Sequence, residues 1–372
     1  MRYHIATRPL SRILTALAGL ALLVAPARAQ YVQTNLVSNI PGLALHEDAD
    51  LTNPWGISSG AATPFWVSDN GSGLSTLYNG AGVKQALVVT IPGGVPTGQV
   101  FNNAGAFQVA PGGPNSNFIF ATENGTIAAW TNSLGTNAIT KFIGGEGSSY
   151  KGLAIAGSGA GARLYGANFG TGNIDVLDGS FAQITVSGGF IDPTLPAGYA
   201  PFNVQNINGN IVVTYAVKGD NGDDVAGAGN GVVDVYDTNG NLLRRLTSGG
   251  ALNSPWGLAF APSTFGPLGN SLLIGNFGDG TINAYDFFTG AMRGTIMGVN
   301  GQPLVNDGLW GLAFGNGNAT FDPNSLYLTA GLNDEADGLF ARITATPEPG
   351  SLVLMATGLF GVIMVGRKRR QL

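Results

Sequence analysis

Between about residue 50 and residue 345, short apolar runs alternate with polar, glycine-rich turns, a pattern that predicts β-strands and almost no helix. One five-residue segment recurs, as in Pro54-Trp55-Gly56-Ile57-Ser58 and Pro255-Trp256-Gly257-Leu258-Ala259. We align four further copies with it, at Ala104 to Gln108, Tyr150 to Ala154, Pro201 to Gln205 and Leu309 to Ala313. Consecutive copies lie 46 to 54 residues apart, enough for four short strands each. The all-β pattern therefore predicts a six-bladed β-propeller.

The sixth repeat lacks a strand. Residues 326–329 and 339–343 supply its second and third strands, and Pro347 follows before a fourth can form. We expect the strand-like segment Tyr31 to Val37 to pair with residues 339–343 and to close the ring. Closure would cover the sheet edges that an open ring exposes. The sequence thus predicts one propeller domain over residues 31–344, with an N-terminal strand closing the last blade.

The repeats resemble those of the NHL-repeat and gluconolactonase-like six-bladed propellers. The segment Pro255 to Ala259 and the strand-turn-strand Ile274-Gly275-Asn276-Phe277-Gly278-Asp279-Gly280-Thr281-Ile282 carry this resemblance. Trp55, Trp256 and Trp310 occupy equivalent positions beside Gly, which favours packing between blades over stacking on a sugar. A carbohydrate platform would need loop aromatics such as Tyr199, Phe277 or Phe169.

The N-terminus has the pattern of a secretory signal peptide. Arg2, Arg8 and Arg12 precede and flank an apolar core over residues 13–25, and Ala27-Arg28-Ala29 provides a small-residue cleavage site. We therefore expect residues 1–29 to be removed and the remainder to be exported.

The C-terminus is a second address. Residues 346–372 contain Pro347-Glu348-Pro349, an apolar run over 351–366, and Arg367-Lys368-Arg369-Arg370. The run predicts a transmembrane helix of about 24 Å at 1.5 Å per residue, with its basic end in the cytoplasm. In this order the elements resemble the PEP-CTERM sorting signal of Gram-negative bacteria, on a propeller family with no assigned activity. An ordinary single-span tail anchor is the alternative.

The PEP-CTERM resemblance implies a partner and a location. The partner is a membrane transpeptidase of the exosortase type, which would remove the helix. The protein would then be an inner-membrane intermediate before it reaches the cell envelope or the extracellular matrix.

Removal of the two ends changes the charge. Of 17 basic and 22 acidic residues, eight basic residues and Glu348 lie in the ends, which leaves nine basic and 21 acidic residues and a net charge of −12. Nucleic acid and anionic lipid are therefore poor partners, whereas cations, or polymers bridged by cations, are better ones.

Two kinds of loop are predicted to emerge on one face of the ring: those that join one blade to the next and those that join the second strand of a blade to the third. Most of these carboxylates fall in such loops. They are Glu47, Asp48, Asp50, Asp69, Glu123, Glu146, Asp192, Asp220, Asp223, Asp224, Asp279, Asp307, Asp334, Glu335 and Asp337. Two interpretations of this acidic face are open: the carboxylates are solvated surface charge, or they form one or more Ca²⁺ sites. Carboxylate and amide oxygens suit Ca²⁺, and the candidate ligands are Asp220, Asp223, Asp224, Glu47 and Asp307.

Catalytic options are few. After the signal only His46 remains, there is no Cys and no Gly-x-Ser-x-Gly segment, so we identify no catalytic residue and do not expect an enzyme. The expected function is a binding or structural module, whose acidic face holds an extracellular polysaccharide or an envelope protein. The alternative is a metal-dependent, lactonase- or esterase-like hydrolase with Glu47, Asn53, Asn203, Asn253 and Asp307 around the channel.

Overall fold

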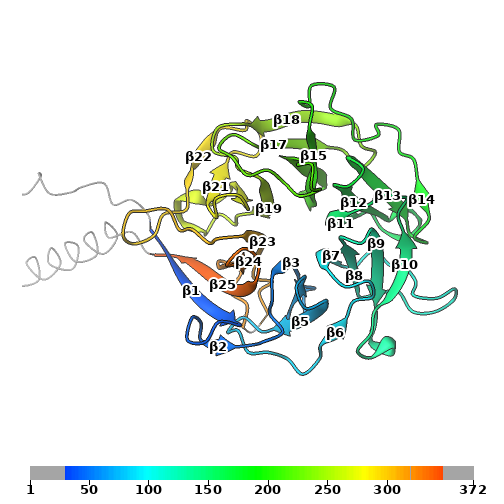
Figure 1. The fold of residues 1–372 in the computed structure, drawn as a ribbon, viewed down its shortest axis with the longest axis horizontal. Coiled ribbons are helices and arrows are strands. Elements are labelled where there is room, and N and C mark those ends of the chain that lie inside the picture. The colour runs from blue at the N-terminus through cyan, green and yellow to red at the C-terminus, as the bar shows by residue number, and fades with distance from the viewer. Residues whose placement is uncertain (1–29, 319, 347–372) are drawn as a thin grey trace, which may run out of the picture. The chain divides into compact units, whose positions relative to one another are not determined.

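Six sheets stand around a central axis as the blades of a propeller (Figure 1). The structure, a computed structural model, describes residues 30–318 and 320–346. The four-stranded part of each blade is antiparallel, and in blades 1 to 5 successive strands of the chain follow one another from the axis outward. The sequence prediction of a six-bladed, all-β propeller is therefore confirmed.

Residues 54–184 form blades 1 to 3. Blade 1 contains β3 (Pro54–Ser58), β4 (Phe65–Asp69), β5 (Leu74–Tyr78) and β6 (Val89–Thr90). Blade 2 contains β7 (Pro96–Phe101), β8 (Phe118–Thr122), β9 (Thr126–Trp130) and β10 (Ile139–Ile143). Blade 3 contains β11 (Tyr150–Ala156), β12 (Arg163–Asn168), β13 (Asn173–Asp178) and β14 (Gln183–Ile184).

Blades 4 and 5 follow the same plan, and blade 6 joins both ends of the ring. Blade 4 contains β15 (Tyr199–Ile207), β16 (Asn210–Val217), β17 (Val232–Tyr236) and β18 (Leu242–Ser248). Blade 5 contains β19 (Pro255–Phe260), β20 (Leu272–Asn276), β21 (Ile282–Tyr285) and β22 (Met292–Thr295). Blade 6 contains β23 (Leu309–Phe314), β24 (Leu326–Leu332), β25 (Asp337–Ala345), β1 (Tyr31–Ser38) and β2 (His46–Glu47). Short 3₁₀ turns occupy Asn132–Leu134, Gly159–Gly161 and Gly266–Leu268.

One repeat start was predicted wrongly. The innermost strand of blade 2 is β7, which begins at Pro96, whereas residues 104–108 lie in the loop between β7 and β8. In β7 the fourth position of the repeat holds Gln99, whereas the other five innermost strands have Ile, Leu or Val there, and the second position holds Thr97, so the apolar pattern that marks the other starts is missing. The other five alignments coincide with innermost strands.

The ring closes through β1. This strand pairs antiparallel with β25, from Tyr31 opposite Ala345 to Ser38 opposite Leu339. Tyr31 also reaches blade 5, because its hydroxyl donates to the Phe265 carbonyl at 3.1 Å and its backbone amide donates to the Met297 carbonyl at 2.8 Å. The predicted closure is confirmed, and β2 extends the same sheet by pairing parallel with β1.

The core is divided among the contacts between blades. Six clusters of buried side chains each join two neighbouring blades. Between blades 1 and 2, for example, the ring of Trp66 stacks on that of Phe118 with 4.1 Å between centroids. A seventh cluster lies at the axis. Because central strands bury both faces, β8 is apolar almost throughout and fully buried.

Parts of the sequence prediction lie outside the described residues. These are the signal peptide 1–29, the predicted transmembrane helix 351–366 and the sorting residues from Pro347 to Arg370. Within residues 30–318 and 320–346, no helix has the length and apolar character needed to cross a bilayer.

Candidate functional site at the axis of the acidic face

One side chain near the start of each innermost strand stands at the axis: the second residue of β3, β7, β11, β19 and β23, and the fourth residue of β15. These residues are Trp55, Thr97, Lys151, Phe202, Trp256 and Trp310. The next position is Gly in five blades because neighbouring innermost strands approach closely there: a Cβ on Gly257 would lie 2.6 Å from the Trp310 carbonyl oxygen, and one on Gly311 would lie 2.6 Å from that of Trp55. The recurring Gly therefore draws the six axial side chains together.

Aromatic rings block the axis. Trp55 and Trp310 stack with 3.5 Å between ring centroids, and Trp256 meets Trp310 edge to face at 5.6 Å. Phe277 stacks on the other side of Trp310 at 4.1 Å. The three Trp residues are at most 4% exposed, which confirms their predicted packing role. Of the suggested platform residues, Phe169 is buried and only Phe277 and Tyr199 are partly exposed.

A ring of backbone hydrogen bonds supports the loops around this plug. In four blades, the residue after the second strand donates its amide to the carbonyl of the residue before the first strand. In blades 3 and 6 the equivalent donor is two residues beyond the end of β12 and one residue before the end of β24, respectively. The six donors are Asn70, Glu123, Gly170, Lys218, Phe277 and Gly331. This repeated bond places one residue of each blade next to the aromatic plug at the axis. Asn70 and Glu123 therefore project from equivalent positions of blades 1 and 2.

Lys151 is the centre of a polar cluster on the plug. Its side chain is only 5% exposed, and its ammonium group pairs with Glu123 and lies 3.8 Å from Asp223 Oδ1. The same ammonium group lies 5.1 Å from the centroid of the Trp55 ring, and the Trp256 indole donates to the Lys151 carbonyl at 3.2 Å. A cation buried to this extent is stable because carboxylates and an aromatic face surround it.

Amide side chains extend the cluster to blades 1 and 6. Asn70 donates to Glu123 at 2.8 Å, and Asn53 donates to Glu335 at 3.1 Å. The Trp310 indole donates to the Asn53 side-chain oxygen at 3.2 Å, which fixes the orientation of that amide. The cluster thus connects five blades around the axis.

Two carboxyl groups of the cluster have altered acidity. Burial raises the pKa of Glu335 to about 7, and the nearby charge of Glu123 adds to the effect, whereas Lys151 opposes it. Burial also raises the pKa of Asp224, one of whose oxygens, Oδ2, is buried without a hydrogen-bond partner among the described residues. Clustered carboxyl groups with perturbed pKa values are a common sign of a functional site.

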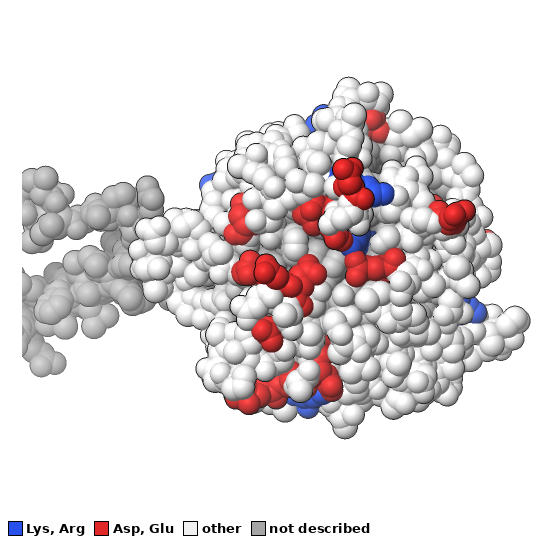
Figure 2. All heavy atoms as spheres, viewed as in Figure 1, with Lys and Arg blue, Asp and Glu red and all other residues white. Residues whose placement is uncertain are grey.

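Figure 2 shows the face that carries this cluster, on which Asp and Glu gather around the centre. Asp69, which was predicted on this face, is fully buried at the end of β4 and accepts from Thr76. Asp48 is also buried, where it pairs with Lys84 and accepts from Tyr78. These two residues are structural parts of blade 1.

The five candidate metal ligands do not converge. Asp223 and Asp224 lie in the loop between β16 and β17 and belong to the cluster, whereas Asp220, in the same loop, is exposed. Glu47 is exposed in β2, and Asp307 is exposed before β23. Across the described part of the chain, no three His, Cys, Asp or Glu residues are grouped as a ready metal site.

The residues of the hydrolase alternative are dispersed as well. Of Glu47, Asn53, Asn203, Asn253 and Asp307, Asn53 alone hydrogen-bonds within the central cluster. Asn203 donates to the Trp256 carbonyl, and Asn253 accepts from the Gly227 amide. His46 lies exposed in β2, the outer edge strand of blade 6.

Sequence reasoning did not identify Lys151 or Glu335 as site residues. The available signal was a break in the repeat, because Tyr150-Lys151-Gly152-Leu153-Ala154 places a cation where three other copies have Trp. Glu335 gave no such signal, since it lies in a turn between β24 and β25.

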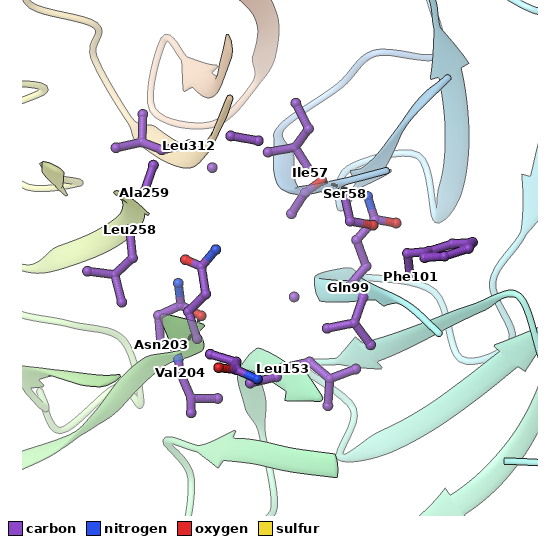
Figure 3. A pocket seen from close by; sticks show the side chains of 18 of the residues that line it. Ile57, Ser58, Gln99, Phe101, Leu153, Asn203, Val204, Leu258, Ala259 and Leu312 are labelled. Carbon is purple, nitrogen blue, oxygen red and sulfur yellow. Dashed lines mark hydrogen bonds between the residues drawn. The ribbon is translucent and has the colours of Figure 1, made fainter. Parts of the chain in front are cut away.

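A cavity of about 550 Å³ occupies the axis beyond the plug (Figure 3). The innermost strands of all six blades line it, mainly with residues that follow the axial side chains, and Trp256 also contributes to its lining. The axial side chains of the plug lie near the starts of the innermost strands, and the lining residues follow them along the chain. The cavity therefore lies on the side of the plug that is opposite to the Lys151 cluster.

Comparisons with known proteins agree with both the tail and the ring. Residues 345–370 match the PEP-CTERM protein-sorting motif, which implies export and membrane-associated sorting by an exosortase. The chain is 33% identical over 325 residues to the uncharacterized protein R648 of Acanthamoeba polyphaga mimivirus, covering 83% of this chain and 78% of that protein. It is 33% identical over 327 residues to protein L690 of the same virus, covering 83% and 84%.

Solved structures show the same fold at low sequence identity. A protein of unknown function from Bacteroides thetaiotaomicron has a TM-score of 0.54 and 10% identity, over 86% of this chain and 77% of that one. A catalytically inactive virginiamycin B lyase from Staphylococcus aureus with quinupristin has a TM-score of 0.50 and 12% identity, over 85% and 99%. These likenesses support the propeller fold alone.

Proposed function

The chain belongs to the family of the mimivirus proteins R648 and L690, and from that premise we propose that it is an exported binding module of the cell envelope or extracellular matrix. Its N-terminal signal directs export, and an exosortase then processes the PEP-CTERM tail at the inner membrane. The propeller is the part that remains outside.

The acidic face is the binding surface of this module. The observation that carries the proposal is the excess of carboxyl groups around Lys151, where Glu123, Asp223, Asp224 and Glu335 surround one buried cation. An added positive charge relieves the repulsion among these groups. The surface therefore favours ligands that bring cations.

The ligand that fits this surface is an extracellular polysaccharide bridged by Ca²⁺. Asp223 and Asp224 offer oxygens at the mouth, but a Ca²⁺ ion takes six to eight of them. Sugar carboxylates and water would complete its coordination. Calcium is then shared between protein and polymer.

The test is retention of the exported protein on immobilised alginate, a polymer of anionic sugars, with Ca²⁺ and with a chelator. We expect retention only with Ca²⁺, and weaker retention for Glu335→Gln and Asp224→Asn. Glu146→Gln, which removes an exposed carboxylate outside the cluster, is the matched control and should bind as the parent does. Retention that ignores Ca²⁺ and both cluster variants would refute the proposal.

One observation favours a hydrolase as the second candidate. A carboxyl group whose pKa is about 7, such as that of Glu335, suits a general base at neutral pH. In that case Glu335→Gln abolishes hydrolysis of a lactone or ester probe while the fold is kept. Equal hydrolysis by parent and variant would exclude this role for Glu335.

A further inference from the structure

The axial cavity has no charged lining. Its walls come from all six innermost strands, and none of the residues that line it is Asp, Glu, Lys, Arg or His. The body around it has 21 acidic residues, so an uncharged surface of this extent is a local property of the site. An ionic ligand would lose its hydration there without gaining a counter-charge.

Short side chains halfway along the innermost strands leave the cavity open. One residue from the middle of each innermost strand contributes to the lining, the fifth residue of β3, β7, β11, β19 and β23 and the seventh of β15. These residues are Ser58, Val100, Ala154, Gln205, Ala259 and Ala313. Five of them have short side chains, and the sixth, Gln205, carries an amide for which no hydrogen-bond partner occurs within the described chain. With 550 Å³, the cavity falls in the range of about 300–1,000 Å³ that small-molecule sites occupy.

Aromatic residues line the cavity at the following position. Phe101, Phe260 and Phe314 are the sixth residues of β7, β19 and β23, and all three are half-buried. Another ring supports each of them: Phe101 meets Phe118 at 5.3 Å, Phe260 meets Phe287 at 6.0 Å, and Phe314 meets Phe265 at 5.0 Å. These contacts hold the three rings in place.

Polar groups lie between the apolar ones. Besides Gln205, the hydroxyls of Ser58 and Ser59 and the amides of Asn103 and Asn206 belong to the lining, among Leu153, Leu258 and Leu312. Figure 3 shows labelled side chains from every blade around the open centre. A ligand for this site needs hydrogen-bonding groups, apolar faces and no charge.

We propose that this cavity binds the uncharged end of a saccharide chain. Neutral sugar rings combine hydroxyl groups, which suit the amides and hydroxyls of the lining, with apolar C–H faces, which suit the Phe and Leu side chains. The Trp plug separates this site from the Lys151 cluster, so binding in the cavity does not depend on Ca²⁺ or on the acidic face.

The test measures binding of neutral trisaccharides to the exported protein. The probes are maltotriose, cellotriose and laminaritriose at concentrations up to about 10 mM, well above a millimolar dissociation constant. Tryptophan fluorescence reports occupancy because Trp256 lines the cavity. Saturation-transfer NMR provides an independent readout. We expect at least one neutral probe to bind, with the same affinity at low and high salt and in the presence of chelator.

Two variants place the site. Gln205→Leu keeps the approximate size of the side chain but removes the amide that would hydrogen-bond the ligand, and it should weaken binding about tenfold. Ala313→Phe should abolish binding by filling the cavity. Glu335→Gln is the control and should leave trisaccharide binding unchanged, whereas it weakens alginate retention. Thus failure of one proposal is distinguishable from failure of the other.

Several results would overturn the cavity assignment. One is the absence of binding by every neutral probe. Another is equal binding of trigalacturonic acid or of an uncharged capped peptide. A third is binding that persists unchanged in Gln205→Leu, which decides the matter even where Ala313→Phe does not fold.

Discussion

The ammonium group of Lys151 lies 5.1 Å from the centroid of the Trp55 ring, at an axial position where three other blades carry Trp. This one change from aromatic to cationic converts the end of an apolar plug into a charged site. It also couples the site to the stability of the ring, because Glu123 depends on Lys151 for its charge partner.

Replacement of Lys151 by Met should destabilise the protein by about 2–3 kcal/mol. The loss is below that of a fully buried pair, because the Glu123 side chain is 26% exposed and water partly solvates it. Urea denaturation of the single and double variants measures the effect. Lys151→Met with Glu123→Gln should recover part of the loss, and a double variant no better than the sum of the singles would contradict the coupling.

Removal of the Tyr31 side chain should weaken the closure of the ring. Tyr31 is 2% exposed, and its ring packs on Phe265 with 4.9 Å between centroids. Tyr31→Ala should therefore cost about 3–5 kcal/mol. Tyr31→Phe keeps the ring, loses the bond to the Phe265 carbonyl and should cost only about 1 kcal/mol.

Deletion of residues 31–37 should be more severe than either point variant. It leaves β25 without its outer partner and exposes a sheet edge. Thermal melting should show a lower, less cooperative transition for the whole domain. A melt that matches the parent's would mean that β1 is dispensable for closure.

Glu335 should make stability depend on pH in a defined direction. Folding raises the pKa of this carboxyl from about 4.5 to about 7, so the folded state favours its protonated form. Its contribution is fully present below about pH 4.5 and is lost as the pH rises through about 7. Relative to the parent, Glu335→Gln should gain up to about 2 kcal/mol at pH 8, since partial exposure limits the effect.

The measurement for Glu335 is urea denaturation at pH 5 and pH 8. Asp334→Asn removes an exposed charge from the same turn and serves as the matched control. If both variants changed the two stabilities alike, general charge reduction would explain the result, and burial of Glu335 would not.

The loop between β16 and β17 should respond to calcium. Neutralising Asp220, Asp223 and Asp224 to Asn should raise the melting temperature without Ca²⁺, since it relieves repulsion toward Glu123 and Glu335 at low salt. It should also reduce the rise on adding Ca²⁺. Mg²⁺ at the same concentration separates a specific site from charge screening. An unchanged calcium response would exclude this loop.

Substitution of the sorting motif should change where the protein is found in the cell. With Pro347, Glu348 and Pro349 replaced by Ala, export should continue, but the uncleaved tail should retain the protein at the inner membrane. Fractionation of a host that contains an exosortase compares membrane-bound and released protein. Normal release of the triple variant would argue against processing at this motif.

The fold could be read from the sequence because its information is local and repeated. A copy such as Pro255 to Ala259 specifies an innermost strand through its own apolar residues and Gly. The missing fourth strand of the sixth repeat made closure by residues 31–37 the consistent solution. Where the local signal was absent, at Thr97 and Gln99 in blade 2, the prediction was wrong.

The sequence by itself determined the six-bladed ring, its closure and the PEP-CTERM sorting motif, whereas only the tertiary structure decided the site. Asn53 meets Glu335 across 282 residues of sequence, and Lys151 meets Glu123 from a neighbouring blade. No local pattern encodes such contacts. They arise because the ring brings equivalent positions of successive repeats to one axis, and burial there alters the acidity of Glu335.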